Sequence, residues 1–150
     1  MNIPRVLVVD DDETIRDTLY ELLSEVYLCQ TAETAEKALA RLEAEPYDVV
    51  LTDISMPGLS GLELLGHVRQ HFPTTPVIII SGISDQEHAQ GLIRIGAFDF
   101  LLKPFSLETV EKSVKRAVDY RTKLLAEEDS AGEIEARGDS LDSNDWKIVT

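Results

Sequence analysis

The sequence predicts an α/β fold: a doubly wound, five-stranded parallel sheet with helices on both faces. Short runs rich in Val, Ile and Leu alternate with longer segments of helical periodicity, five times along the chain. Several of the runs are continuously apolar, which is typical of strands buried on both faces of a parallel sheet. Right-handed crossovers through the intervening helices arrange such strand-helix units side by side in an open sheet.

The candidate strands are five short apolar runs, at residues 6–9, 27–29, 49–51, 77–80 and 98–102. The only cysteine, Cys29, lies in the second run, and we interpret it as a small buried hydrophobic residue. For these strands we expect the flavodoxin-like order 2-1-3-4-5, which places the first strand near the middle of the sheet.

Segments of helical periodicity follow each candidate strand. The fourth, residues 85–95, has the weakest pattern, and the fifth has the strongest. Ser106 is the predicted N-cap of the fifth helix, where Glu108 and Glu111 place negative charge near the positive end of the helix dipole. The apolar positions of the first, second, third and fifth predicted helices, in that order, are Ile15, Leu19, Leu22, Leu23 and Val26; Ala35, Ala38, Leu39 and Leu42; Leu62, Leu65, Val68 and Phe72; and Leu107, Val110, Val114, Ala117, Val118 and Leu124.

Composition divides the chain into one domain and a tail. A length of 150 residues with 43% hydrophobic residues suits a single domain with an ordinary core, which we place at residues 1–124. Residues 126–150 hold eight acidic and two basic residues and few apolar ones. We therefore interpret residues 125–150 as an acidic tail or linker that is partly disordered.

The net charge of −14 argues against several classes of partner. Binding to a phosphate backbone rests on Lys and Arg, so direct nucleic-acid binding is not expected, and binding to anionic lipid is disfavoured for the same reason. Neither a basic-then-apolar leader nor a run near the length of a membrane span is present, so we expect a cytoplasmic protein that does not bind membranes.

Polar residues follow four of the five candidate strands. They are Asp10-Asp11-Asp12 after the first, Asp53 after the third, Ser81-Gly82 after the fourth and Lys103-Pro104 after the fifth. Because the carboxyl ends of parallel strands meet at one edge of the sheet, these side chains are expected to converge there.

A cluster of carboxylates needs a positive partner. Two carboxylates about 4 Å apart repel each other by about 4 kcal/mol at an effective dielectric constant of about 20. An all-oxygen, carboxylate-rich site favours Mg²⁺, and Lys103 adds a second positive charge. Carboxylate, Mg²⁺, ammonium and the hydroxyl of Ser81 are together the groups needed to transfer a phosphoryl group to an aspartate.

Four segments of the chain resemble the motifs of the response-regulator receiver domain of two-component signalling. They are residues 8–11 (VVDD), 51–58 (LTDISMPG), 80–82 (ISG) and 96–105 (GAFDFLLKPF), and the resemblance covers residues 4 to about 123. It implies a signalling switch, not an enzyme with a separate substrate: the domain catalyses only its own phosphorylation and dephosphorylation.

The resemblance also implies a role for each residue of the site. Asp53 would accept a phosphoryl group from a histidine kinase or phosphotransfer protein. Asp11 would bind Mg²⁺ directly and Asp10 mainly through water, beside Asp53 and the backbone carbonyl of Ser55. Lys103, aimed inward by a cis bond to Pro104, would contact the phosphoryl group. Ser81 would move toward it while Phe100 turns from exposed to buried, which would change the preferred partner, including a second copy, of the fourth helix, fifth strand and fifth helix.

Other interpretations remain for the same residues. Asp12 is expected to cap the first helix, and capping alone would explain one aspartate but not the whole cluster. Residues 10–14 also satisfy the DxDxT pattern of a Mg²⁺-dependent phosphatase of the haloacid-dehalogenase type with Asp10 as nucleophile, although the order of the remaining groups argues against it. An FMN binder of the same fold is disfavoured because three aspartates would repel the phosphate. A receiver-like module that no longer takes phosphate is disfavoured because every part of the site is present.

The three histidines are not part of this site. His67 and His71 are four residues apart on one helical face, a spacing that can bind metal. Neither a third ligand nor an HExxH pattern accompanies them in the sequence, and His88 has no partner there, so the sequence alone does not support a metal site at these residues.

Overall fold

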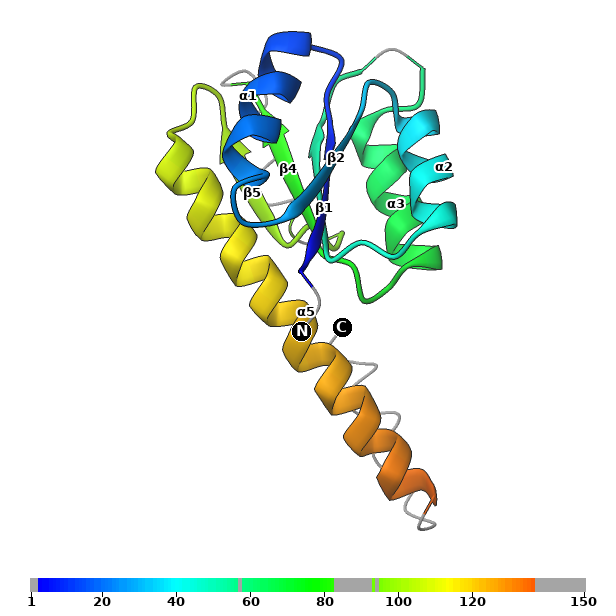
Figure 1. Ribbon diagram of the computed structural model, residues 1–150. Helices are drawn as coiled ribbons and strands as arrows, with labels where there is room; N and C mark the ends of the chain where they lie inside the picture. The colour runs from blue at the N-terminus through cyan, green and yellow to red at the C-terminus, as the bar shows by residue number, and fades with distance from the viewer. Residues whose placement is uncertain (1–2, 57, 83–92, 94, 137–150) are drawn as a thin grey trace.

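The computed structural model has the predicted architecture, a five-stranded parallel sheet in the order β2-β1-β3-β4-β5 with helices on both faces (Figure 1). The structure describes residues 3–56, 58–82, 93 and 95–136, with side chains through residue 128. The predicted fourth helix, residues 85–95, lies almost entirely outside the described residues. The strands are β1 Arg5–Val9, β2 Leu28–Ala32, β3 Val49–Asp53, β4 Val77–Ser81 and β5 Asp99–Leu102, and the helices are α1 Glu13–Leu23, α2 Ala35–Ala44, α3 Gly61–His71 and α5 Leu107–Ala136.

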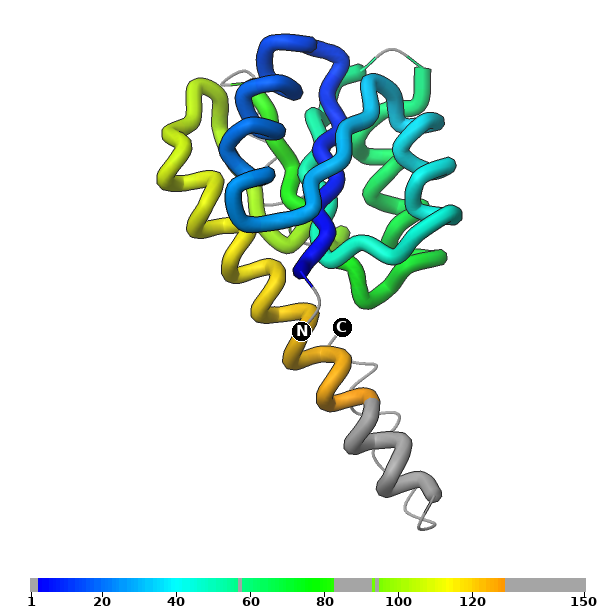
Figure 2. Tube along the Cα trace, viewed as in Figure 1, coloured from blue at the N-terminus to red at the C-terminus, as the bar shows by residue number. Residues whose placement is uncertain are grey.

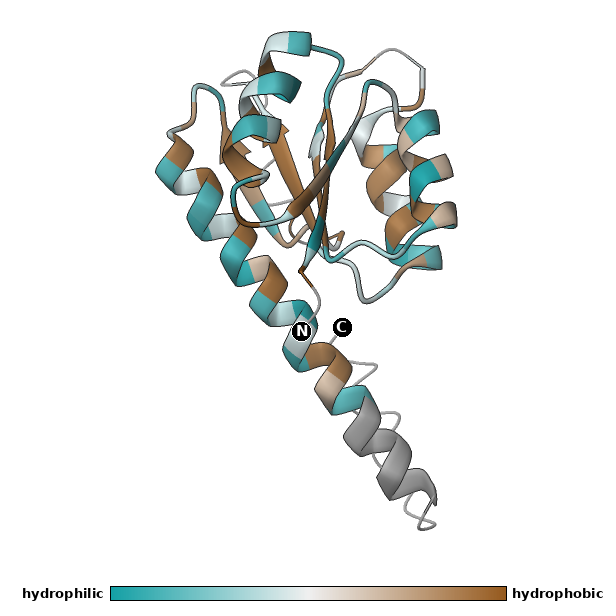
Figure 3. Ribbon diagram, in the orientation of Figure 1, coloured by the Kyte–Doolittle hydropathy of each residue, from teal (hydrophilic) through white to brown (hydrophobic). Residues whose placement is uncertain are grey.

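The two faces of the sheet carry separate cores. On β1, Leu7 and Val9 face a core that α2 and α3 cover, whereas Val6 and Val8 face a core that α1 and α5 cover. This alternation follows from the two-residue period of a strand. Apolar residues accordingly dominate the central strands, and polar residues lie on the outward sides of the helices (Figure 3). The continuously apolar runs in the sequence were therefore a correct signal for strands buried on both faces.

Three helices differ in detail from the predicted pattern; in α5 the first predicted apolar position, Leu107, is 44% exposed. α1 ends at Leu23, and Val26 is 64% exposed in the connection to β2. In α3 the buried face is formed by Leu64, Leu65 and Val68, whereas Leu62 is 40% exposed. Leu62 and Leu65 are three residues apart, but Leu64 lies nearer the centre of the stripe that faces the sheet, so Leu62 falls at its solvent side.

The predicted start of α5 is confirmed, and the helix extends beyond the predicted domain. The Ser106 hydroxyl accepts a hydrogen bond from the Thr109 N–H at 3.1 Å. The helix continues to Ala136 (Figure 1), and it already passes the end of the sheet within the part that Figure 2 colours. The first part of the predicted tail is therefore helical, and residues 137–150 lie outside the described residues. Among the described helices, α5 included, none is both long and apolar enough to cross a bilayer.

Two carboxylates fasten α5 to the sheet. Asp99, at the start of β5, accepts hydrogen bonds from the Ser113 hydroxyl at 2.7 Å and from Arg116 at 2.6 Å. Asp48, just before β3, accepts from Arg121 at 2.8 Å. These contacts lie at the amino ends of the strands, opposite the edge where the predicted site lies, so they hold the helix without occupying that site.

Candidate functional site

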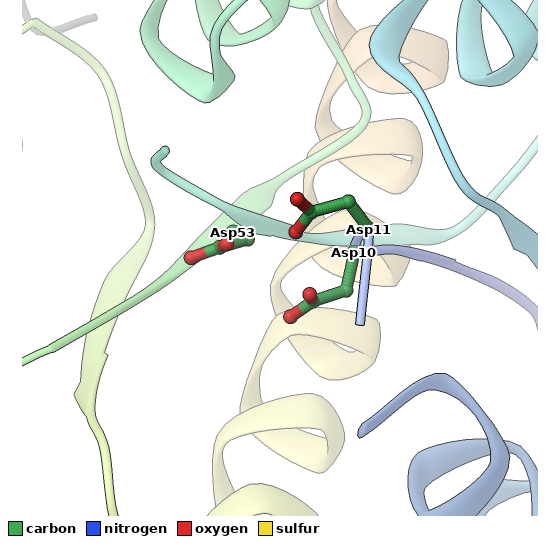
Figure 4. A group of neighbouring side chains, drawn as sticks. All are labelled: Asp10, Asp11 and Asp53. Carbon is green, nitrogen blue, oxygen red and sulfur yellow. The ribbon is translucent and has the colours of Figure 1, made fainter. Parts of the chain in front are cut away.

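The carboxyl ends of β1 and β3 bring three aspartates together. One carboxylate oxygen from each of Asp10, Asp11 and Asp53 lies within 4.8 Å of the others. Figure 4 shows Asp10 and Asp11 coming from the segment after β1 and Asp53 from the neighbouring strand. Asp10 is fully buried and Asp53 is 7% exposed, whereas Asp11 is exposed. The predicted convergence of the two acidic segments is confirmed.

Lys103 supplies the positive charge that the carboxylates require. Its Nζ lies 3.4 Å from Oδ2 of Asp10 and 3.4 Å from Oδ1 of Asp53, so one ammonium serves two carboxylates. The peptide bond from Lys103 to Pro104 is cis, as the resemblance implied. The Lys103 N–H donates to the carbonyl oxygen of Ser81 at 2.6 Å, which joins the ends of β4 and β5.

The main chain around Asp10 is held on several sides. Its N–H donates to the Ala32 carbonyl at 3.1 Å, and its carbonyl accepts from Arg16 at 2.7 Å. Its Oδ1 accepts from the Asp12 N–H at 2.9 Å. Asp12 itself caps α1 by accepting from the N–H groups of Thr14 and Ile15. Asp12 therefore caps the first helix as predicted, while the Asp10 side chain lies in the aspartate cluster.

Burial and mutual repulsion disfavour the charged forms of the two buried acids. Burial raises the pKa of Asp10 above the ordinary range of aspartate, against the opposing effects of the Asp12 N–H and Lys103. Burial also raises the pKa of Asp53, and the negative charge of Asp10 adds to this shift while Lys103 opposes it. One lysine therefore does not compensate three carboxylates, and a further cation would stabilise their charged forms.

The donor set fits Mg²⁺. The three ligands are all carboxylate oxygens, and the set includes neither sulfur nor imidazole, which suits a hard cation. Asp11 is open to solvent, which leaves room for the water molecules that Mg²⁺ retains. Ser55, whose backbone carbonyl is the expected additional ligand, lies two residues beyond Asp53 on an exposed loop.

Ser81 and Phe100 occupy different environments. Ser81 is fully buried at the end of β4. Phe100 on β5 is half-buried and packs against the core beneath α2 and α3. Phe100 is thus neither fully exposed nor fully buried.

Gly61 is a site residue that the motifs did not identify. It is the first residue of α3, and its N–H donates to the Ile54 carbonyl at 3.0 Å. A Cβ atom at Gly61 would lie 2.1 Å from the carbonyl oxygen of Asp53 and 2.8 Å from the Cα of Ile54. Only glycine allows α3 to approach the backbone of the predicted phosphoacceptor so closely. A glycine directly after the Ser60 N-cap was the available signal in the sequence.

Comparisons with known proteins agree with this geometry. The family model for the response regulator receiver domain matches residues 6–115. The chain is 39% identical over 138 residues to the DNA-binding transcriptional regulator NtrC of Salmonella typhimurium, covering 91% of this chain and 29% of that protein. It is 35% identical to the response regulator protein PilR of Pseudomonas aeruginosa, covering 81% and 27%. The chain thus spans under a third of the length of these relatives.

Solved structures show the same similarity. The receiver domain of NtrX from Brucella abortus superposes with a TM-score of 0.73 at 38% identity, covering 76% of this chain and 98% of that chain. A response regulator receiver domain protein from Clostridium thermocellum superposes with a TM-score of 0.76 at 32% identity, covering 82% and 99%. Both comparisons cover nearly all of the solved receiver chains.

The close approach of α3 predicts opposite effects for two glycines of the same helix. Gly61→Ala should destabilise the domain by about 3 kcal/mol, because the new methyl group would overlap the main chain of Asp53. Gly66→Ala is the matched control: a Cβ there meets no atom within 4 Å, so it should stabilise by up to about 1 kcal/mol. Urea unfolding measures both changes, and a stabilising Gly61→Ala would contradict the packing.

The buried charges predict a pH-dependent effect of Asp10→Asn in metal-free protein. Asparagine keeps an acceptor for the Asp12 N–H and removes a buried charge, while Lys103 retains Asp53, so the variant should be more stable by about 1–3 kcal/mol at neutral pH. A raised pKa means that the wild-type penalty is absent below the unfolded-state pKa and grows as pH rises toward the folded-state pKa. The advantage of the variant should therefore be small in acid.

The measurement is urea unfolding with a chelator across a pH series. Asp17→Asn on the exposed side of α1 removes the same charge and should change the free energy of unfolding by less than about 0.5 kcal/mol. A less stable Asp10→Asn at neutral pH would show that the Lys103 contact outweighs burial.

Proposed function

The chain belongs to the response regulator receiver domain family, and from this premise we propose that Asp53 is the residue that accepts a phosphoryl group. The donor is a histidine kinase or a phosphotransfer protein. The proposal is carried by one observation: Asp53 shares a site with two further aspartates and with Lys103, which lies 3.4 Å from its carboxylate. This is the charge arrangement that phosphoryl transfer to an aspartate requires.

Asp53 suits the role of nucleophile better than Asp10 does. The Asp10 side chain is fully buried, and its two oxygens face the Asp12 N–H and the Lys103 ammonium. The Asp53 side chain retains 11% exposure. An Asp53 oxygen can therefore reach phosphorus in line with the departing imidazole nitrogen of a phosphohistidine, which breaks the P–N bond as the new O–P bond forms. The phosphatase alternative, which needs Asp10 as nucleophile, has no support in the family match.

Asp10, Asp11, Asp53 and the backbone carbonyl of Ser55 would hold Mg²⁺. When bound, the ion supplies positive charge that offsets the negative charge of the transferred phosphoryl oxygens. Lys103 would contact a phosphoryl oxygen while it keeps its ion pair with Asp10. Asp11 would bind the ion directly and Asp10 mainly through water, with the Asp10 main chain held by the Ala32 carbonyl and the Arg16 side chain.

The switch acts through Ser81 and Phe100. The Ser81 hydroxyl moves to bind a phosphoryl oxygen on Asp53, and Phe100 turns further into the space that this movement opens. The hydrogen bond from the Lys103 N–H to the Ser81 carbonyl passes the movement to β5. The surface that responds is that of the fourth helix, β5 and α5, which serves a partner protein or a second copy of the chain.

If Asp53 is the phosphoacceptor, the chain should take up one phosphoryl group, and this uptake should depend on the Asp53 side chain. Incubation with acetyl phosphate and Mg²⁺ should add one phosphoryl group per chain, and intact-protein mass spectrometry should show its loss in Asp53→Ala. Asp12→Asn, which keeps a helix cap, is the matched control and should be phosphorylated as the wild type is. Sustained turnover of p-nitrophenyl phosphate that requires Asp10 would contradict the proposal and favour a phosphatase.

We expect that removing the Ser81 hydroxyl leaves phosphorylation of Asp53 intact but uncouples it from the change in β5 and α5. Ser81→Ala should still accept the phosphoryl group, but beryllofluoride should shift the amide NMR signals of β5 and α5 much less than in the wild type. Ser81→Thr keeps the hydroxyl and should retain the response. An alanine variant whose signals shift as much as those of the wild type would show that the switch does not run through this hydroxyl.

A further inference from the structure

His67 and His71 are two imidazole side chains, a residue type that can ligate metal, that the proposed phosphorylation site does not use. Both lie on the exposed side of α3, and their imidazole rings are stacked with centroids 6.0 Å apart and an angle of 21° between the ring planes. The pair is therefore formed in space as well as in the sequence, since residues four apart on a helix point to the same side.

The chemistry of this pair differs from that of the acidic cluster. Two imidazole nitrogens favour Zn²⁺, Ni²⁺ and Cu²⁺ over Mg²⁺, which prefers oxygen; Zn²⁺ binds imidazole nitrogen at about 2.0–2.1 Å. Side-chain rotation closes two neighbouring rings around one such ion, and the second imidazole then binds at high effective concentration. Water completes the coordination sphere, because within the described side chains the only group of three or more candidate ligands is the aspartate cluster.

The surroundings of the pair favour a cation. His71 is the last residue of α3, so a bound ion would lie beside the negative end of the helix dipole. Arg69 lies between the two histidines in sequence, but its side chain packs against Gly96. Its charge is therefore directed away from the histidine face.

We propose that His67 and His71 form a two-histidine site for a divalent transition-metal ion, Zn²⁺, Ni²⁺ or Cu²⁺, at the end of α3. The site is separate from the phosphorylation site: Gly61 contacts the Asp53 backbone, and the two histidines lie about 9–15 Å further along the helix axis at 1.5 Å per residue. Occupation of this site does not require phosphorylation of Asp53, and phosphorylation does not require it.

The test is a calorimetric titration of the full chain, without a polyhistidine tag, with ZnCl₂ in excess Mg²⁺ at neutral pH. The chain has three histidines, so His67→Gln, His71→Gln and His88→Gln each leave two. The first two variants should weaken Zn²⁺ binding at least about tenfold, because each leaves only one imidazole of the pair on α3 and the two-ligand chelate is lost. His88→Gln, the matched control, should bind as the wild type does, and so should Asp53→Ala.

Two results would overturn the site. One is equal weakening by His88→Gln and His67→Gln. The other is binding that His67→Gln leaves unchanged and Asp11→Asn abolishes, which would assign the zinc to the aspartate cluster. Electron paramagnetic resonance of bound Cu²⁺ provides an independent readout: coupling to two imidazole nitrogens supports the site, and coupling to one contradicts it.

Discussion

Electrostatic crowding at the carboxyl edge of the sheet is the constraint on which the site depends. Three carboxylates lie within 4.8 Å of one another, two of them almost or fully buried, with one ammonium between Asp10 and Asp53. Burial opposes their charge and raises the pKa of both buried acids. Such a cluster lowers the free energy of unfolding of the domain, and perturbed acids of this kind are typical of functional sites, where a bound cation and a transferred phosphoryl group interact with them.

The parallel sheet creates this crowding through its strand order. β1 lies between β2 and β3, so the segment after β1 is fixed by Ala32 on one side and faces Asp53 on the other. Gly61 then lets α3 begin directly against the Asp53 main chain. The position of the carboxylates thus rests mainly on contacts of the main chain at Asp10 and Asp53.

The sequence predicted the parts that depend on local pattern. Continuous apolar runs identified the buried strands, and polar residues at their ends identified Asp10, Asp11, Asp53, Ser81 and Lys103 as neighbours. Contacts between segments far apart in sequence had no such signal: nothing local indicates that Asp48 binds Arg121 or that the Thr75 hydroxyl donates to the Tyr47 carbonyl. The end of α5 was missed because acidic residues after Leu125 suggested a tail, yet Glu and Ala are also good helix formers.

The route from the site to α5 is short. The Lys103 N–H bonds to the Ser81 carbonyl, and Lys103 directly follows β5, so the end of β4 at Ser81 is joined to the end of β5 beside the site. At its other end β5 holds α5 through Asp99, which binds Ser113 and Arg116. Arg121 fixes the helix again at Asp48. Among the described residues α5 is thus tied to the sheet at both Asp99 and Asp48, and it extends beyond the sheet (Figure 2), so under the proposed function a change at the Ser81 end of β5 would reach α5 through Asp99.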